Sequence, residues 1–401
     1  MFNNPMKTIV SAQNATIYND DGSTHIDLLG ANGTILLGHC HPSVVKELAE
    51  QSQKVWITGR LNTNTRLLAK ELVEKIIPQN YYVSGFYSTG MEAAEFALRA
   101  SRVLTRRKNL VGFDQSMHGK SMATAYLAWP NDYGYPQPGF VRLPFPSTDQ
   151  SDNVLKKLEM TLSQKDTAAV FLEPIQGSGG GAVADRNFCQ SLTDLCKKYE
   201  TLLIVDEILT GFYRTGSLFF HSRLPLDPDI ILIGKCIGNG FPVSAVLMRR
   251  DLETHSKMLP FSTYAENSLA AAAIIGTLGE MRKLPIETMA NSIDRTINLY
   301  LHSIVPDSFN LSIYGAFCIM DTRDPAIAKS IADDCYLEGL IISQAGSVIR
   351  LFPPITIEGG QLEKALNILN HAIIRNCSDS FTFCQLHSLS KTANVHSLSI
   401  T

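Results

Sequence analysis

Charged residues follow three short apolar runs in the middle of the 401-residue chain, where they could support chemistry together. Glu173 follows the run AAVFL, Asp206 and Glu207 follow LLIV, and Lys235 follows IILIG. In an open α/β sheet, ligands bind beyond the carboxyl ends of the strands. We therefore expect these acids and the lysine to meet at one edge of a sheet, although a single polar residue at a strand end is more often a turn residue or a cap.

Lys235 has the clearest chemical use of these residues. A cation at the end of a buried strand is costly unless it is paired or neutralised. Desolvation lowers the pKa of an amine, and a neutral amine can form a Schiff base with a carbonyl compound. The alternative is an ion pair with Asp206 or Glu207. If the carbonyl compound is pyridoxal phosphate, a nearby aspartate keeps the ring nitrogen protonated, and the ring then draws electrons from the substrate.

The segment YSTGMEAAE (87–95) offers a place for the phosphate of such a cofactor. Ser88, Thr89 and Gly90 lead into a helix that begins near Met91. Backbone N–H groups and the helix dipole attract an anion there. An ordinary capped helix start would contain the same residue types, so this segment alone does not decide between a phosphate site and a simple helix cap.

The elements that must position these residues follow from the apolar patterns. Strands that are nearly all apolar and alternate with helices imply a parallel sheet that is covered on both faces. From about residue 311 the pattern changes to a smaller α+β unit, and the polar tail from Ser378 is given no structure. The predicted strands are 109–114, 168–175, 201–207, 229–235 and 347–353, and the predicted helices are 91–107, 187–200, 267–283, 327–340 and 361–374.

Composition excludes several classes of function. The net charge of −3 does not indicate the excess of positive charge that binding to nucleic acid or to an anionic membrane requires. No apolar run is long enough to cross a bilayer, and the start MFNNPMKTIV has no signal-peptide pattern. Eight cysteines without a CxxC pair suit free thiols, so we expect a cytoplasmic protein. We interpret HCH (39–41) as a turn rather than as a metal site.

Eight segments resemble, in their order along the chain, the class III (omega-type) aminotransferases, which depend on pyridoxal 5'-phosphate. They cover nearly the whole chain. The segments are DGSTHIDLLGANGTILLGHCHPSVV (21–45), STGMEAAEFALRASR (88–102), MHG (117–119), EPIQG (173–177), DEILTGFYRTG (206–216), GKCIGNGFP (234–242), STYAENSLAAAA (262–273) and GLIISQAGSVIRLFPPITI (339–357).

This resemblance implies a fold and a division of the chain. The fold is α/β and aspartate-aminotransferase-like (fold type I), with a mostly parallel sheet in a large domain and a smaller α+β C-terminal domain. The implied parts are an N-terminal segment that packs with the small domain (1–48), the large cofactor-binding domain (49–280), the small domain (281–376) and a tail (377–401).

The resemblance also implies roles at the cofactor ring. Lys235 forms the Schiff base and then moves a proton between the substrate carbon and the cofactor. Asp206 pairs with the pyridine nitrogen. Ile208 packs against one face of the ring, and the turn at Met117 and His118 covers the other face.

Further roles are implied at the phosphate and the substrate. Thr89, Gly90 and Met91 hold the phosphate, and Thr263 reaches the cofactor of the neighbouring subunit in a homodimer. Arg350 binds the carboxylate of an amino or keto acid, for which its guanidinium has the right geometry; without the resemblance, a structural salt bridge would be favoured. The other candidate substrate residues are Glu173, Ser178 and Trp56. Trp56 and Arg60 could equally have packing roles.

Three positions depart from the pattern of the best-known members of that family. Leu209 stands where many have a glutamine that donates to the cofactor, and Met117 stands where an aromatic ring usually stacks. Ser178 stands where glutamate-using members have a glutamate that pairs with the substrate arginine. We therefore hypothesise an unusual amine or carbonyl partner, in specialised biosynthesis.

The expected reaction moves an amino group between an amino donor and a carbonyl acceptor by a ping-pong mechanism. An aminomutase or a racemase would use the same lysine, aspartate and phosphate site, but it would need no second keto substrate. A remoter alternative is an NAD(P)-dependent oxidoreductase, because GSGGGA (177–182) fits a loose dinucleotide motif with Asp206 as the ribose acid. That reading leaves Lys235 unexplained.

Overall fold

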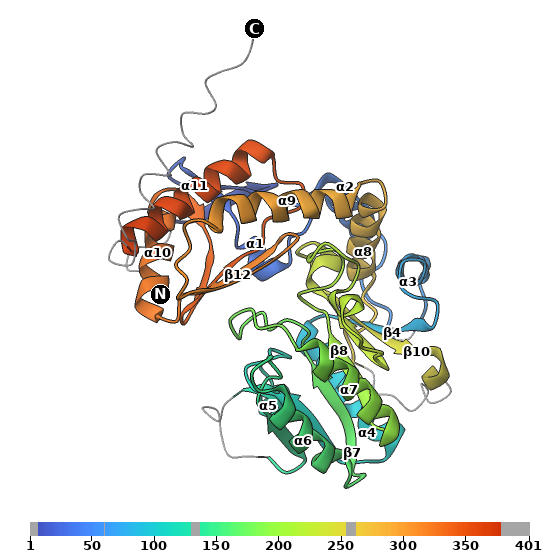
Figure 1. The fold of residues 1–401 in the computed structure, drawn as a ribbon. Coiled ribbons are helices and arrows are strands. Elements are labelled where there is room, and N and C mark those ends of the chain that lie inside the picture. The colour runs from blue at the N-terminus through green and yellow to red at the C-terminus, as the bar shows by residue number, and fades with distance from the viewer. Residues whose placement is uncertain (1–6, 60, 130–136, 254–261, 378–401) are drawn as a thin grey trace.

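A computed structural model describes residues 7–59, 61–129, 137–253 and 262–377 (Figure 1). Seven strands form its central sheet, in which β10 is antiparallel to both neighbours and all other neighbouring pairs are parallel. The predicted, mostly parallel sheet is therefore present. In spatial order the strands are β4 (Tyr81–Tyr87), β10 (Ser244–Arg249), β9 (Ile230–Ile233), β8 (Leu202–Asp206), β7 (Thr167–Leu172), β5 (Asn109–Phe113) and β6 (Phe140–Leu143).

Successive residues of the central strands are buried on opposite faces of the sheet, as its apolar sequence requires. In β8, Ile204 packs with the core beneath α4 (Gly90–Thr105), whereas Leu203 and Val205 pack with the core beneath α6 (Ser151–Leu162) and α7 (Arg186–Lys198). The remaining helices of this unit are α2 (Pro42–Ser52), α3 (Asn64–Glu74), α5 (Met122–Ala128) and α8 (Ser268–Met281), with short 3-10 turns η1 (Phe220–Arg223) and η2 (Lys235–Gly238).

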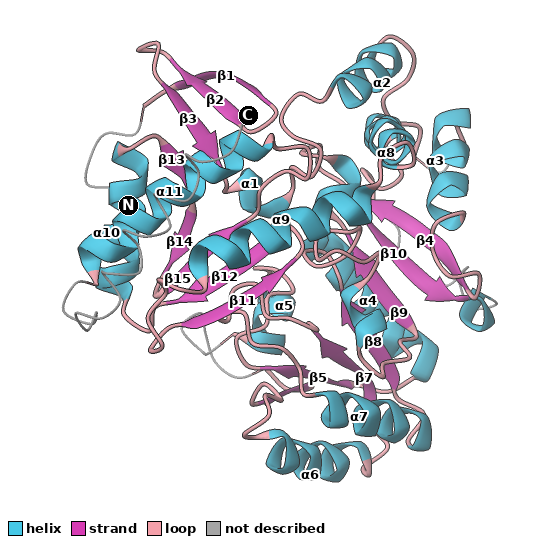
Figure 2. Cartoon of the chain, turned by 45° about the horizontal axis from the view of Figure 1, so that its top comes forward, coloured by secondary structure: helices cyan, strands magenta, loops and turns pink. Residues whose placement is uncertain are grey.

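A second, smaller unit follows α8, and Figure 2 shows it beside the central sheet. Its sheet is antiparallel, in the order β11 (Asn310–Tyr314), β12 (Phe317–Asp321), β15 (Val348–Leu351) and β14 (Ser343–Ala345). Its helices are α9 (Ile286–Leu301), α10 (Pro325–Leu337) and α11 (Gly359–Asn376). The predicted elements from 109 onward thus occur in the predicted order, with small differences at their ends.

The N-terminal residues join this smaller unit. Strands β1 (Ile9–Gln13), β2 (Thr16–Asn19) and β3 (Thr24–Asp27) form a sheet with β13 (Leu340–Ile341). The next segment, α1 (Gly30–Gly33), has four consecutive residues with φ between 48° and 84°, in the left-handed region. It lies so close to the site region that a Cβ on Gly33 would be 2.8 Å from Leu209 Cδ1. The proposed domain boundaries stay a prediction.

Arg214 ties these parts of the chain together. Its side chain is fully buried, and its Nη atoms donate to the carbonyls of Gly33, Ile35, Ala316 and Pro353 at 2.7–3.2 Å. Two of these acceptors belong to the N-terminal segment and two to the smaller unit. A loop of the large unit therefore fixes the other two parts through one guanidinium.

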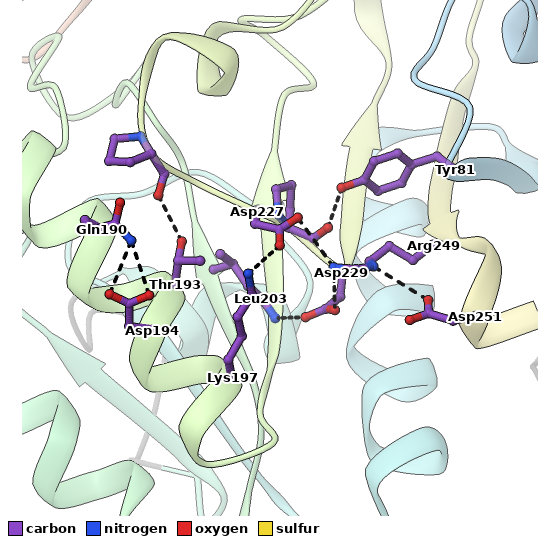
Figure 3. A network of polar contacts seen from close by, with 12 residues as sticks. Tyr81, Gln190, Thr193, Asp194, Lys197, Leu203, Asp227, Asp229, Arg249 and Asp251 are labelled. Atoms are coloured by element: carbon purple, nitrogen blue, oxygen red, sulfur yellow. Dashed lines mark hydrogen bonds and ion pairs between the residues drawn. The ribbon is translucent and has the colours of Figure 1, made fainter.

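Charged residues at the far end of the central strands form the network in Figure 3. Asp229 accepts the Leu203 N–H at 2.8 Å, and Arg249 lies 3.4 Å from Asp227 and 3.6 Å from Asp251. Asp227 and Asp229 precede β9, Arg249 ends β10 and Asp251 follows it, so these groups hold the sheet at the end opposite to Lys235.

The described ranges contain no helix that is long and apolar enough to cross a membrane, and no group of three or more His, Cys, Asp or Glu side chains arranged to hold a metal ion. In the HCH segment, His39 bonds Asp27 at 2.7 Å and His41 accepts the Ser43 N–H at the start of α2. Each histidine thus has a local structural partner, as expected of a turn.

Candidate active site

The structure brings Glu173, Asp206 and Lys235 to one edge of the central sheet. They lie at or just after the ends of β7, β8 and β9, which are adjacent parallel strands. Burial lowers the pKa of Lys235, and the charges of Glu173 and Asp206 partly oppose that shift. Among the described residues no carboxylate forms an ion pair with the amine, so the ion-pair alternative is not observed. A buried amine with a lowered pKa is available as a nucleophile.

Lys235 also has an unusual backbone conformation. Its φ is 44°, in the left-handed region that a residue with a Cβ rarely adopts, and it begins the 3-10 turn η2. Such strain persists only where the surroundings enforce it, and it is frequent at functional sites.

Asp206 is held by two hydrogen bonds. Its Oδ2 lies 2.8 Å from His118 Nδ1, and its Oδ1 accepts the Ile208 N–H at 3.0 Å. The other ring nitrogen of His118 is buried and has no partner among the described residues. The ring therefore donates to Asp206 through Nδ1, which fixes the orientation of both side chains. The sequence did not predict this contact, since it offers no signal that joins residues 118 and 206.

The start of α4 is capped by a side chain and packs against Ile208. Thr89 is the N-cap and accepts the Glu92 N–H at 3.1 Å, and Gly90 is the first helical residue. Ile208 packs closely there: a Cβ on Gly90 would lie 2.8 Å from Ile208 Cδ1, and a Cβ on Gly234 would lie 3.3 Å from Ile208 Cγ2. Ile208 thus lies between the helix start and the end of β9, next to Lys235, and exposed Met91 lies in the first turn.

Thr263 lies at the surface of this chain, in a turn that is fixed at both ends. The Ser262 hydroxyl bonds Glu92 in the first turn of α4. At the other end, Glu266 accepts the Phe86 N–H at 3.0 Å and pairs with Arg66 at 3.1 Å. Thr263 is therefore presented outward from a rigid support.

Arg350 lies on β15, opposite Ser343 of β14. Its Nε and Nη2 donate to the Ser343 hydroxyl at 3.1 and 2.7 Å, and burial lowers its pKa while the charge of Glu173 opposes that shift. No described carboxylate pairs with it, so the structural salt bridge that we weighed as an alternative is not observed.

Ser178 is half-buried in the loop between the large and small units. Gly181 of this loop accepts the Ser312 hydroxyl of β11 at 2.9 Å. The loop is no dinucleotide turn, because Ile175 and Val183 pair across it and the next helix begins only at Arg186. Leu209 packs between the backbones of Gly33 and Gly177, an apolar contact that the sequence did not predict.

Trp56 lies at the surface with 59% of its area exposed, and its indole N–H donates to the Ser52 carbonyl at 2.8 Å. In the single chain Trp56 is therefore exposed and lines no buried pocket among the described residues. Its role in substrate binding stays a prediction. Arg60, which we also considered for the substrate pocket, lies outside the described residues.

Comparisons with known proteins agree with this geometry. The family model described as "Aminotransferase class-III" matches residues 2–373. Over 399 residues, 2-aminoadipate transaminase of Pseudomonas putida is 29% identical, covering 91% of this chain and 95% of that one. Acetylornithine aminotransferase of Bacillus anthracis is 30% identical over 382 residues, covering 91% and 94%.

Solved structures show the same fold. Taurine:2-oxoglutarate aminotransferase of Bifidobacterium kashiwanohense, in complex with PLP and glutamate, has a TM-score of 0.87 at 19% identity and covers 94% of each chain. An S-selective transaminase of Bacillus megaterium has a TM-score of 0.85 at 22% identity, again covering 94% of each chain. The predicted fold type I architecture is confirmed.

Proposed function

We propose that this chain exchanges an amino group between an amino donor and a carbonyl acceptor by a ping-pong mechanism. The chain belongs to the class III aminotransferases and is a pyridoxal-phosphate-dependent transaminase. The family and the cofactor predicted from the sequence are thereby confirmed. The observation that carries the proposed mechanism is the half-buried amine of Lys235, which lies at the strand ends with Asp206 and has no ion-pair partner among the described residues.

The residues present fit the cofactor. The first N–H groups of α4, at Gly90 and Met91, would hold its phosphate. Ile208 and Met117 would flank the ring, and Asp206 would pair with the ring nitrogen. When bound, the cofactor supplies an aldehyde that exchanges amines and a ring that draws electrons from the substrate carbon.

The chain itself supplies proton transfer and charge. The Lys235 amine, whose pKa is lowered by burial, takes a proton from the substrate carbon and returns it to the product. Asp206 is held in place for the ring nitrogen because His118 and the Ile208 N–H both donate to it. Asp206 and His118 are buried, and the exclusion of water strengthens the contact between them.

The substrate side is proposed to bind a carboxylate through Arg350. Ser343 occupies only one side of the guanidinium, which leaves other N–H groups for a bidentate partner. The substrates named for the relatives, acetylornithine and 2-aminoadipate, both carry carboxylates. Ser178 offers a hydroxyl rather than a second acid, which supports a partner other than glutamate and a role in specialised biosynthesis.

A homodimer with shared active sites is the proposed assembly. Thr263 is exposed on a rigid turn, and large apolar side chains nearby are exposed as well, at 65% for Tyr264, 59% for Trp56 and 72% for Leu61. The Ser268 N–H donates to the Trp56 carbonyl at 2.9 Å, which keeps the two segments together. A second copy would cover this apolar surface. We further propose a cytoplasmic enzyme, consistent with free, mostly buried cysteines in the described chain.

The test is a screen of amino donors and carbonyl acceptors against the cofactor-loaded enzyme, in which the absorption bands of the two cofactor forms are followed. A donor that converts one form and an acceptor that restores it would support the exchange. Turnover that needs no added donor or acceptor would indicate an aminomutase or a racemase. Fastest conversion by glutamate, by a wide margin, would count against the unusual partner.

A further inference from the structure

Arg350 lies on the face of the smaller sheet that is turned toward the large unit. Successive residues of a strand point to opposite faces, so Arg350 shares the face of Val348, two residues before it on β15. Val348 belongs to an apolar cluster with Ile175 and Leu209, which lie in the loops after β7 and β8. Ile349, on the other face, belongs to the core that includes residues of α10. The guanidinium is therefore on the side of the strand ends that carry the candidate site.

The hydroxyl of Ser343 holds one edge of the Arg350 guanidinium. Ser343 lies directly opposite Arg350 on the neighbouring strand β14, and only 5% of it is exposed. Its oxygen accepts from Nε of Arg350 at 3.1 Å and from Nη2 at 2.7 Å. Nε and Nη2 form the side-on edge of a guanidinium, so this oxygen occupies a fork in which a carboxylate would otherwise bind.

The other edge of the guanidinium, between Nη1 and Nη2, is open. Among the described residues nothing forms a hydrogen bond with Nη1, and Nη1 is not one of their buried side-chain atoms that lack a partner. It is therefore accessible. Each of the two Nη atoms keeps an N–H that points away from the Ser343 hydroxyl, and two such parallel donors match the two oxygens of a carboxylate.

We propose that Ser343 is a positioning residue, which fixes Arg350 so that the edge between Nη1 and Nη2 receives the carboxylate of the substrate. This inference rests on the proposed role of Arg350, and it adds the edge that binds and the residue that selects this edge. A long side chain that is fixed before its ligand arrives loses less freedom on binding. A hydroxyl suits this task because it accepts from both N–H groups without neutralising the cation, as an acid at residue 343 would do.

Isothermal titration calorimetry of the cofactor-loaded enzyme with hexanoate and with hexanamide tests this. Hexanoate has a carboxylate but no amine, aldehyde or ketone to react, and hexanamide has the same chain without the charge. We expect Ser343→Ala to weaken hexanoate binding by about three- to tenfold and to change hexanamide binding by less than about twofold. Ser343→Thr keeps the hydroxyl on a side chain that suits a strand, and it should restore hexanoate affinity to within about twofold of the wild type.

Two further variants complete the experiment. Ser101→Ala is the matched control, because Ser101 is buried in α4 and its hydroxyl donates to the Leu98 carbonyl at 2.9 Å within the same helix. It should leave the affinities for hexanoate and hexanamide unchanged. Arg350→Leu tests the carboxylate site itself and should weaken hexanoate binding by about tenfold or more.

Unchanged or tighter hexanoate binding by Ser343→Ala, in an enzyme that loses binding with Arg350→Leu, overturns the inference and leaves Arg350 as the carboxylate site. Equal losses of hexanoate and hexanamide, or no rescue by Ser343→Thr, would show a role in packing alone and also overturn it. No hexanoate binding by the wild type, or no effect of Arg350→Leu, overturns both the inference and the proposed role of Arg350. If Ser343→Ala does not fold, Ser343→Cys decides, since a thiol is a weak acceptor and the same loss is expected.

Discussion

Replacing Gly90 by alanine tests whether the start of α4 and Ile208 together shape the cofactor site. Gly90 has an ordinary helical backbone, and alanine keeps its N–H, so the number of phosphate donors is unchanged. The added Cβ would lie 2.8 Å from Ile208 Cδ1, whereas ordinary van der Waals contact begins at 3.4 Å. Ile208 must therefore move by about 0.6 Å, away from the helix start.

The size of the effect follows from this overlap. Overpacking of this kind costs about 1–3 kcal/mol, and the lower backbone entropy of unfolded alanine returns at most about 1 kcal/mol. If the displaced Ile208 presses on the ring, the loss appears mainly in cofactor binding. We expect the dissociation constant of pyridoxal phosphate to rise by about ten- to a hundredfold, since each 1.4 kcal/mol is a factor of ten.

Equilibrium dialysis with pyridoxal phosphate measures this, with Ile208→Val as the second mutation of a cycle. Valine lacks Cδ1, and the nearest remaining atom would be Cγ2 at 3.2 Å. Gly90→Ala should then cost less than about threefold in the valine background. Gly279→Ala in α8, where a Cβ meets nothing within 4 Å, is the control and should leave cofactor affinity unchanged. An equal loss in both backgrounds, or no loss, would refute the reasoning.

Three further variants test other parts of the site. His118→Phe keeps the ring shape but removes the 2.8 Å bond to Asp206. Because such bonds to charged groups contribute about 1.5–3 kcal/mol, cofactor affinity measured by dialysis should fall at least tenfold; an unchanged affinity would mean that Asp206 needs no support. Arg350→Leu should raise KM for carboxylate-bearing donors by about tenfold or more and leave KM for amines without a carboxylate unchanged. An equal rise of KM for both kinds of donor would contradict the role of Arg350. Arg214→Met leaves four carbonyls without their donor. It should lower the free energy of unfolding, measured in urea, by about 3 kcal/mol or more. A loss below about 1 kcal/mol would show that water replaces the guanidinium.

Periodicity and chain order predicted the elements and their sequence because local patterns encode them. The apolar runs before Glu173, Asp206 and Lys235 became adjacent strands β7, β8 and β9, so the rule that ligand-binding residues gather at strand ends sufficed to bring the three together. The exact strand ends and the antiparallel β10 were not predicted, since they depend on pairing between distant segments.

Contacts between distant residues could not be predicted in the same way. The bond from His118 to Asp206 joins residues that are 88 positions apart, and the packing of Leu209 between Gly33 and Gly177 joins three separate segments. The sequence indicates that leucine cannot donate a hydrogen bond there. Only the packed structure shows that its apolar side chain fills a gap between two backbones.

The same long-range contacts explain why Lys235 is left without an ion pair. A lysine between two buried acids would normally pair with one of them. Here Asp206 is already bound by His118 and the Ile208 N–H, and Glu173 is already bound by the N–H groups of Met117 and Gly177. Each carboxylate thus has its own donors, and each acts on the amine only through its charge. Burial is then the largest effect on the amine and lowers its pKa at the edge of the sheet, which favours the chemistry that is proposed for it.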